Sequence, residues 1–305
     1  MKAWIFPGQG AQYVGMGRDL YDHHFTRGFM SRACESLGVD LLSLMIEGPE
    51  EKLTLTENAQ PAILLHSITT AELLRLHRQY PDLVAGFSLG EFSALVVARV
   101  LSFHDALRLV RLRGKAMQEA VAPGVGSMAA IIGLEATQVE TLCREVSSEG
   151  EVVVANYNAP GQVTISGLKE KVLLVLERAK AMGARRAVEL RVSAPFHTKY
   201  MVAASDKLRE ALREIEVKPP KIPVISNVTG EPFPDDPVEI RELIAKQACS
   251  PVRWESSVRK MVDMGASFFL EVGPGKVLTG LNRRIDKRVV TDYTDGRLVF
   301  NSVTT

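Results

Sequence analysis

A glycine-rich turn at residues 83–91, LVAGFSLGE, joins a short apolar run to a second apolar run that suits a helix. Residues 83–85 predict a buried strand, and residues 86–90 form a G-x-S-x-G motif directly after it. A sharp strand-to-helix turn needs glycines, because side chains there would collide, and it pushes the serine hydroxyl into the open. The serine also lies at a helix N-terminus, where free N–H groups favour negative charge. Ser88 is therefore a candidate nucleophile. The alternative is a turn that uses glycine only for its flexibility, with a serine that has no catalytic role.

Strand and helix patterns alternate on both sides of this turn, which indicates a mainly parallel sheet covered by helices. Short apolar runs at residues 3–6, 223–226 and 268–272 predict further strands. Apolar periodicity predicts helices, the second of them with Ser102 as its N-cap, at residues 57–80, 102–120, 200–214, 238–247 and 254–264.

The middle of the chain follows a different order. Predicted strands at 128–132, 152–156, 163–166 and 187–192, with helices at 136–146 and 169–182, give β-α-β-β-α-β, the ferredoxin-like order. We predict an α/β fold in two parts. One is a large α/β-hydrolase-like domain with a mainly parallel sheet, residues 1–125 and 194–305. The other is an inserted small ferredoxin-like (βαββαβ) sub-domain, residues 126–193.

The composition argues against several classes of protein. The 37 Lys and Arg residues balance 36 Asp and Glu, so a nucleic-acid binder that depends on an overall positive field is not expected. The three cysteines, Cys34, Cys143 and Cys249, are far apart and fit neither a disulfide framework nor a zinc motif. The apolar run at 93–101 is interrupted by Arg99, which argues against a membrane span. The apolar run before Pro7 is too short for the core of a signal peptide. We expect a cytoplasmic protein without a membrane span.

A serine nucleophile needs a base, and among the histidines His197 has the most suggestive position. It follows the predicted strand 187–192 and a kink at Pro195, and ligands bind at strand ends in open α/β sheets. From spacing alone, a capping or exposed loop histidine remains the alternative. Arg113 lies on the predicted helix 102–120, where periodicity alone favours a solvated arginine.

Six ordered motifs resemble the malonyl-CoA:acyl-carrier-protein transacylase family, the acyltransferases of fatty-acid synthesis. The resemblance runs from residue 4 to about residue 285 and is far more specific than the serine motif alone. The motifs are residues 6–12, 86–91, 113–117, 156–162, 194–197 and 271–275.

The resemblance implies catalytic roles for the matched residues. Ser88 would take the malonyl group as an ester, and His197 would be the general base. The family lacks a triad carboxylate, so the backbone carbonyl of Gln247 would orient the imidazole. The backbone N–H groups of Gln9 and Leu89 would form the oxyanion hole, where one donor typically contributes about 3 kcal/mol.

The resemblance also implies the residues that bind the acyl group. Arg113 would bind the malonyl carboxylate through its planar guanidinium, which reverses the expectation from periodicity. Gln60, Asn156 and Asn158 would line the pocket. Phe87 stands where the family usually has His, and this puts a contact near the site entrance in doubt.

The implied reaction moves malonyl from malonyl-CoA to the phosphopantetheine thiol of an acyl carrier protein, by ping-pong kinetics and without a cofactor. We expect a monomer with no nucleic-acid or membrane partner. Carrier proteins of this type are acidic, and candidate docking cations are Arg178, Lys180, Arg185, Arg186, Arg191, Arg283, Arg284, Lys287 and Arg288. The alternatives are a malonyltransferase serving a polyketide synthase, a serine thioesterase or hydrolase, and a non-catalytic carrier-binding module.

Overall fold

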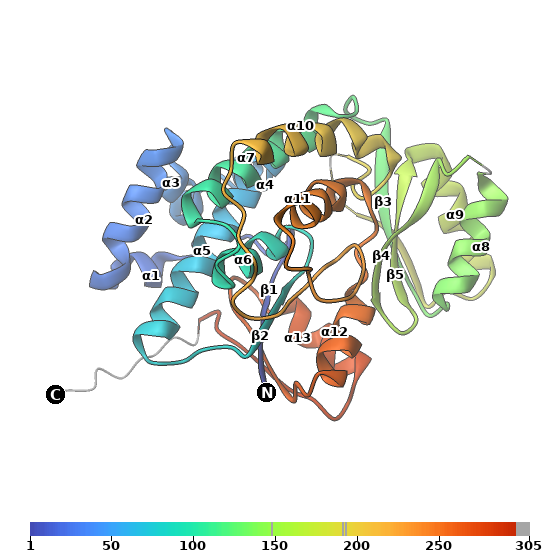
Figure 1. Ribbon diagram of the computed structural model, residues 1–305. Coiled ribbons are helices and arrows are strands. Elements are labelled where there is room, and N and C mark those ends of the chain that lie inside the picture. The colour runs from blue at the N-terminus through green and yellow to red at the C-terminus, as the bar shows by residue number, and fades with distance from the viewer. Residues whose placement is uncertain (148, 191, 193, 297–305) are drawn as a thin grey trace.

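The computed structural model describes residues 1–147, 149–190, 192 and 194–296 (Figure 1). In this part of the chain, parallel strands form a central sheet in the order β7-β2-β1-β8-β9. The strands are β1 (Lys2–Phe6), β2 (Leu83–Gly86), β7 (Val224–Ile225), β8 (Phe268–Glu271) and β9 (Val290–Tyr293). The strand order reverses between β1 and β8, and ligands bind beyond the carboxyl ends of strands at such a point.

Helices cover both faces of the central sheet, because alternate residues of each strand point to opposite faces. Trp4 and Phe6 of β1 share one core with the helices α1 (Arg18–Asp22), α2 (His24–Leu37), α3 (Leu41–Glu47), α4 (Glu50–Thr54), α5 (Thr56–Leu76), α6 (Gly90–Val97), α7 (Phe103–Glu119), α10 (Val202–Arg213) and α11 (Pro237–Lys246). Ala3 and Ile5 face the other side, where they pack against α12 (Trp254–Asp263) and α13 (Val277–Ile285).

A separate antiparallel sheet has the strand order β4-β5-β3-β6. Its strands are β3 (Gly126–Ile132), β4 (Val152–Ala159), β5 (Gln162–Leu168) and β6 (Arg186–Glu189). Figure 1 shows α8 (Ala136–Val146) and α9 (Lys169–Ala181) on its outer face, where they pack on Ile131 and Ile165. The opposite face, with Ala130 and Thr164, lines the pocket that also contains Ser88.

The predicted mixed α/β fold, with a parallel sheet and a separate antiparallel sheet, is confirmed. The limits 126–193 for the small sub-domain remain our proposal, and residues 148, 191 and 193 within them lie outside the described residues. In the described ranges no helix is long and apolar enough to cross a membrane, and no cluster of three acidic, His or Cys side chains could hold a metal.

Several element boundaries differ from the prediction. Helix α5 ends at Leu76 and not at residue 80, since Arg78 just beyond it is left-handed, with φ +56°. Strand β6 ends at Glu189 and not at residue 192. The helices α1–α4 and α13 and the four-residue strand β9 were not predicted. Except for α2, these elements have fewer than ten residues and so carry little periodicity. Ser102 caps α7 as predicted, since its side chain accepts the N–H of Asp105 at 3.1 Å.

Candidate active site

Strand β2 ends in a tight turn that places Ser88 directly before α6. Ser88 has φ +50°, a left-handed conformation that costs about 1–3 kcal/mol unless its surroundings hold it. A Cβ atom on Gly86 would lie 1.9 Å from the Gly90 carbonyl carbon, and one on Gly90 would lie 2.1 Å from the Phe6 carbonyl oxygen. Both glycines are therefore needed for α6 to pass this close to β1 and β2.

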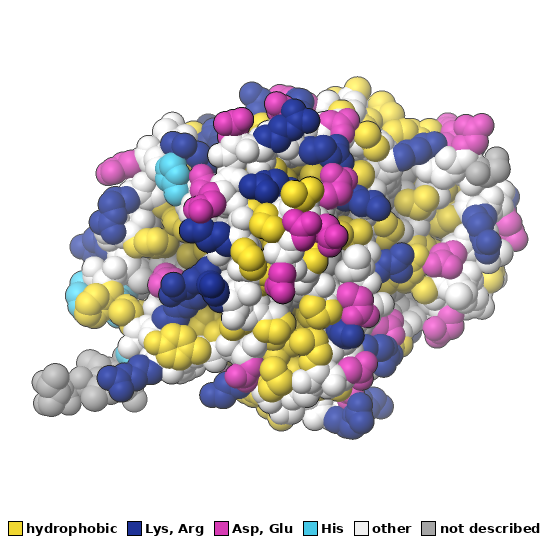
Figure 2. Space-filling view, viewed as in Figure 1, with side chains coloured by type: hydrophobic (Ala, Val, Ile, Leu, Met, Phe, Trp, Pro, Cys, Tyr) yellow, Lys and Arg dark blue, Asp and Glu magenta, His cyan; other side chains and the backbone are white. Residues whose placement is uncertain are grey.

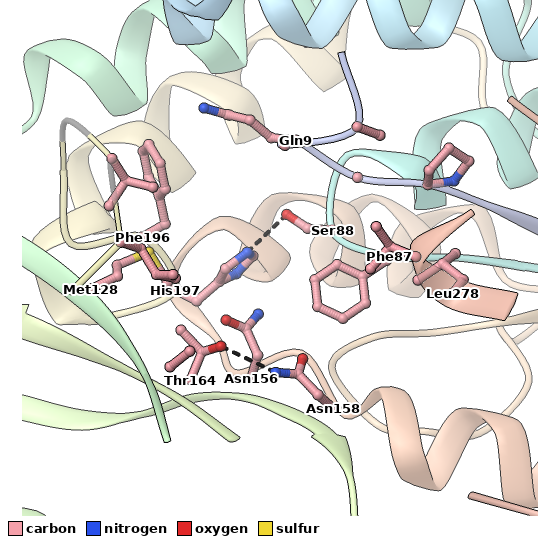
Figure 3. Close-up of a pocket in the computed structure, with 18 of the residues that line it drawn as sticks. Gln9, Phe87, Ser88, Met128, Asn156, Asn158, Thr164, Phe196, His197 and Leu278 are labelled. Carbon is pink, nitrogen blue, oxygen red and sulfur yellow. Dashed lines mark hydrogen bonds between the residues drawn. The ribbon is translucent and has the colours of Figure 1, made fainter. Parts of the chain in front are cut away.

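The imidazole of His197 reaches Ser88 from the loop before the 3-10 helix η1 (Lys199–Met201). The distance from His197 Nε2 to Ser88 Oγ is 2.8 Å (Figure 3). On the other side of the ring, Nδ1 lies 3.1 Å from the Gln247 carbonyl oxygen and 3.0 Å from that of Ser250. Carbonyl oxygens only accept hydrogen bonds, so this network assigns the proton to Nδ1. Nε2 then presents its lone pair to the serine hydroxyl.

The surroundings of His197 keep its ring neutral. Burial, and secondly the nearby charge of Arg113, lower the pKa of His197 to about 4, while hydrogen bonding to the Gln247 and Ser250 carbonyls opposes the shift. At neutral pH the ring is therefore in the basic form that a general base requires. Neutral carbonyls stabilise an imidazolium less than the aspartate of a Ser-His-Asp triad does.

Arg113 enters the same site from α7 and is buried. Its Nη2 donates to Ser88 Oγ at 3.1 Å and to Gln247 Oε1 at 2.8 Å, and its Nη1 donates to Gln60 Oε1 at 2.9 Å. Among the described residues its Nε has no hydrogen-bond partner, which leaves a buried donor. Burial lowers the pKa of Arg113 to about 10, so the side chain stays charged at neutral pH. The expectation of a solvated arginine from periodicity alone is wrong.

A cavity of about 330 Å³ lies between the two sheets and contains these groups. Gln9 and Gln60 line it from the large-sheet side, with Gln60 Nε2 donating to Gln9 Oε1 at 3.4 Å. Asn156 and Asn158 lie across the pocket from Gln9 in Figure 3, and Asn158 donates to Thr164 Oγ1 at 3.1 Å. Most of the remaining lining is apolar and includes Pro7, Ala11, Phe87, Met117, Met128, Leu190, Val192, Phe196, Val277, Leu278 and Leu281.

Leu89 differs from the other predicted site residues, because its side chain is buried outside the cavity lining of the described residues. It is the N-cap residue of α6, directly after Ser88. Helix N-termini leave backbone N–H groups without an intrahelical partner. The side chain of Leu89 thus lies in the core, and a role of its backbone N–H in an oxyanion hole remains a prediction.

Comparisons with known proteins identify the family of this chain. The model of the acyl transferase domain family matches residues 3–294. Over 291 residues the chain is 45% identical to the malonyl CoA-acyl carrier protein transacylase of Bacillus subtilis (strain 168), covering 95% of this chain and 92% of the relative. The chain belongs to the malonyl-CoA:acyl-carrier-protein transacylase family.

Solved structures of this transacylase family share the whole fold. The acyl-carrier-protein S-malonyltransferase of Burkholderia pseudomallei 1710b matches with a TM-score of 0.92 at 44% identity, covering 96% of this chain and 95% of that one. A malonyl-transacylase in complex with its type II PKS acyl-carrier protein matches with a TM-score of 0.93 at 42% identity, covering 96% of each chain. The family resemblance deduced from six motifs is confirmed.

Two buried residues around Ser88, Asn227 and Glu91, were not predicted as site residues of this transacylase. Asn227 Oδ1 accepts the backbone N–H of Ser88 at 2.6 Å. Glu91 accepts the backbone N–H of Asn227 at 2.5 Å. A signal for Asn227 was present, because it follows the predicted strand 223–226 at the sheet edge where Ser88 also lies. Glu91 lies within the motif at residues 86–91, but neither the motif nor its spacing indicates a role for it.

Phe87, the departure from the family pattern, lies in the cavity wall of this transacylase. Its ring packs against that of Trp254, with the ring centroids 5.8 Å apart and the planes at 60°. With Phe in this position, Ser88 Oγ lies 2.8 Å from His197 Nε2. Phe87 thus makes this part of the wall apolar.

Proposed function

We propose that this enzyme transfers malonyl from malonyl-CoA to the phosphopantetheine thiol of an acyl carrier protein, in support of fatty acid biosynthesis. The observation that carries the proposal is the buried Arg113 beside the Ser88–His197 pair, with Nη2 3.1 Å from Ser88 Oγ. A malonyl thioester bears a carboxylate two carbons from the carbonyl under attack. A buried guanidinium next to the nucleophile suits that carboxylate, whereas an esterase for uncharged acyl groups has no need of it.

In the first half-reaction, Ser88 Oγ attacks the thioester carbonyl while its proton passes to His197 Nε2. The tetrahedral oxyanion accepts hydrogen bonds from the backbone N–H groups of Leu89 and Gln9. Collapse of this intermediate breaks the carbon–sulfur bond, and His197 returns the proton to the departing CoA sulfur. Malonyl is left as an ester on Ser88, with its carboxylate on Arg113.

In the second half-reaction, the carrier thiol gives its proton to His197 and attacks the Ser88 ester. The carbon–oxygen bond breaks, and the proton returns to Ser88 Oγ, so the enzyme leaves the cycle unchanged. No cofactor takes part in this scheme. The ester must survive until the carrier arrives, and the apolar lining around the cavity helps to exclude water.

The test is to incubate the protein with malonyl-CoA in the presence and absence of the phosphopantetheine-bearing carrier. We expect CoA release to stop after one equivalent without the carrier and to continue with it. Continuous rapid CoA release without the carrier would support the thioesterase alternative. No release and no acylation would support a non-catalytic carrier-binding module.

A polyketide carrier is the second candidate acceptor. A structural neighbour at 42% identity is a malonyl-transacylase in complex with its type II PKS acyl-carrier protein. Comparison of kcat/KM for a fatty-acid carrier and a polyketide carrier distinguishes the two roles. Cytoplasmic location and a monomeric state remain predictions.

We further propose that an acidic carrier docks at the α13 rim of the pocket. On the face shown in Figure 2, basic and acidic side chains are interspersed, so docking would depend on local cations. Arg284 is exposed and donates to Gln162, a cavity-lining residue, at 2.6 Å. Two other candidate cations, Arg178 and Arg288, form ion pairs with Glu145 and Asp286. Arg191 lies outside the described residues.

Arg284→Glu should lower kcat/KM for the carrier about three- to tenfold at low salt and less at high salt, because rim charges act mainly on association. The acylation rate with malonyl-CoA should be unchanged. A higher KM for malonyl-CoA with normal use of the carrier would assign this cation to CoA instead.

A further inference from the structure

Asn227, which lies shortly after β7, forms hydrogen bonds with the backbone of the turn that contains Ser88. Asn227 Oδ1 accepts the Ser88 N–H at 2.6 Å, and its Nδ2 donates to the Gly86 carbonyl at 2.7 Å. The side chain is fully buried and lies outside the cavity lining of the described residues. One amide group therefore bridges the two ends of the turn that carries the nucleophile.

Glu91 accepts hydrogen bonds from Asn227 and Gln247, the two residues that bond to the Ser88 backbone. It lies three residues after Ser88 in the first turn of α6 and is buried. Its Oε2 accepts the backbone N–H of Asn227 at 2.5 Å, and its Oε1 accepts Gln247 Nε2 at 3.1 Å. The same Gln247 nitrogen donates to the Ser88 carbonyl at 2.7 Å. The N–H and carbonyl groups of Ser88 are thus fixed by Asn227 and Gln247, and Glu91 connects these two.

The hydrogen-bond pattern requires both side-chain oxygens of Glu91 to act as acceptors. Gln247 Oε1 accepts from Arg113, which orients the Gln247 amide with its nitrogen towards Glu91. Burial raises the pKa of Glu91, while its N–H donors and the charge of Arg113 oppose that shift and favour the ionised form. Since both oxygens face N–H donors, the geometry is that of a carboxylate. An amide at position 91 would turn an NH₂ group towards one of these donors.

We propose that Asn227 and Glu91 are positioning residues for acyl transfer, which act through the Ser88 backbone and Gln247 to keep Ser88 Oγ within reach of both His197 and Arg113. Neither residue is among the described residues that line the cavity. This inference rests on the proposed transacylase function. It predicts that their loss slows the reaction of Ser88 with any acyl group, in contrast to the loss of Arg113, which acts on the carboxylate.

The test measures kcat and KM for malonyl-CoA, and acylation rates with malonyl-CoA and acetyl-CoA, in Asn227→Ala. We expect kcat to fall about 10- to 100-fold, the effect of a small displacement of reacting groups. KM should stay within about threefold, and both acyl groups should be affected by the same factor. Asn227→Asp keeps the acceptor for the Ser88 N–H but loses the donor to Gly86, so it should fall between wild type and Asn227→Ala.

The matched control is Thr69→Ala, which removes another buried hydrogen bond, from Thr69 Oγ1 to the Leu65 carbonyl in α5. It should lower thermal stability while leaving kcat near the wild-type value. Glu91→Gln should lower kcat at least as far as Asn227→Ala. Combined with Asn227→Ala it should lose less than the product of the two effects, because both act through one network.

The possible outcomes distinguish the proposed function from the positioning role. A wild-type protein that transfers no malonyl would overturn the proposed function and this inference with it. Wild-type transfer together with a kcat for folded Asn227→Ala near that of Thr69→Ala would overturn the positioning role alone. A loss confined to KM, or to malonyl and not acetyl, would do the same. If Asn227→Ala fails to fold, the same criteria apply to Asn227→Asp.

Discussion

The two walls of the pocket are built differently. On the large-sheet wall, Ser88, Arg113 and Gln247 belong to one network of hydrogen bonds between 2.7 and 3.1 Å long. On the small-sheet wall, Asn158 and Thr164 bond to each other and lie on the strand face opposite α8 and α9. The difference suggests that the large-sheet wall fixes the reacting groups and the small-sheet wall shapes the space beside them. Variants of the first wall should therefore change kcat, and variants of the second wall should change KM.

The largest effect is expected from removal of the base. His197→Ala should lower kcat for malonyl transfer by about 10²- to 10⁴-fold, because Ser88 loses its proton acceptor. Steady-state transfer assays, with circular dichroism to verify folding, measure this change. A folded His197→Ala protein that keeps more than about a tenth of the wild-type rate would contradict the assignment of His197 as the base.

Arg113→Ala should affect malonyl selectively. Loss of the buried partner of the malonyl carboxylate should cost about 2–5 kcal/mol in kcat/KM for malonyl, with a smaller loss for acetyl. Lys115→Ala on the same helix is the control, because Lys115 is exposed and, within the described part of the chain, its ion pair is a long one, 3.9 Å from Glu119. Equal losses for malonyl and acetyl in Arg113→Ala would refute the carboxylate role.

The pH dependence of acylation tests the electrostatics of the large-sheet wall. The folded pKa of His197, about 4, lies below its ordinary value of 6.5. Its basic form therefore persists as the pH falls to about 5. At pH 5.5, kcat/KM for acylation should remain within about twofold of its value at pH 7, whereas a histidine of pKa 6.5 would lose about tenfold. An acid limb centred near pH 6.5 would contradict this environment.

The lowered pKa of His197 also makes the free energy of unfolding depend on pH. Between pH 6.5 and about 4 the unfolded chain takes up a proton at His197 and the folded chain does not. The contribution of this group to the free energy of unfolding is thus fully present above pH 6.5 and is lost as the pH falls towards 4. Thermal unfolding of wild type and His197→Ala across this range should show a steeper decline for wild type.

The smallest effect is expected on the small-sheet wall. Asn158→Ala removes the bond to Thr164 and widens the pocket, but touches none of the hydrogen bonds given above for Ser88 or Arg113. KM for malonyl-CoA should rise about two- to fivefold while kcat stays within about twofold. A kcat loss as large as that of His197→Ala would remove the distinction between the two walls.

Local patterns explain how much of this site could be predicted from the sequence. Glycine spacing around Ser88 and the alternation of strands and helices act over a few residues, so they predicted the turn and the fold class. Arg113 lies three or four residues from the buried Leu109, Val110 and Met117, so it shares their inward face. Because arginine usually prefers solvent, periodicity alone did not predict that Arg113 is buried. The family resemblance was needed to place Arg113 in the site.

The supporting network could not be predicted in the same way. The bonds from Asn227 to Ser88 and Glu91 join positions 139 and 136 residues apart in the chain. They depend on β7 lying beside β2, which no local pattern specifies. The carbonyl of Ser250, the residue directly after the 3-10 helix η2 (Gln247–Cys249), lies 3.0 Å from His197 Nδ1, although the two residues are 53 positions apart in the chain. Such contacts follow from the tertiary fold and from no motif.

The most direct test of the central claim is intact mass spectrometry of the protein after mixing with malonyl-CoA. Wild type should gain the mass of one malonyl group and lose it again when the phosphopantetheine-bearing carrier is added, while Ser88→Ala should gain nothing. A malonyl adduct that persists in Ser88→Ala, or one in wild type that the carrier cannot remove, would contradict transfer through the Ser88 ester.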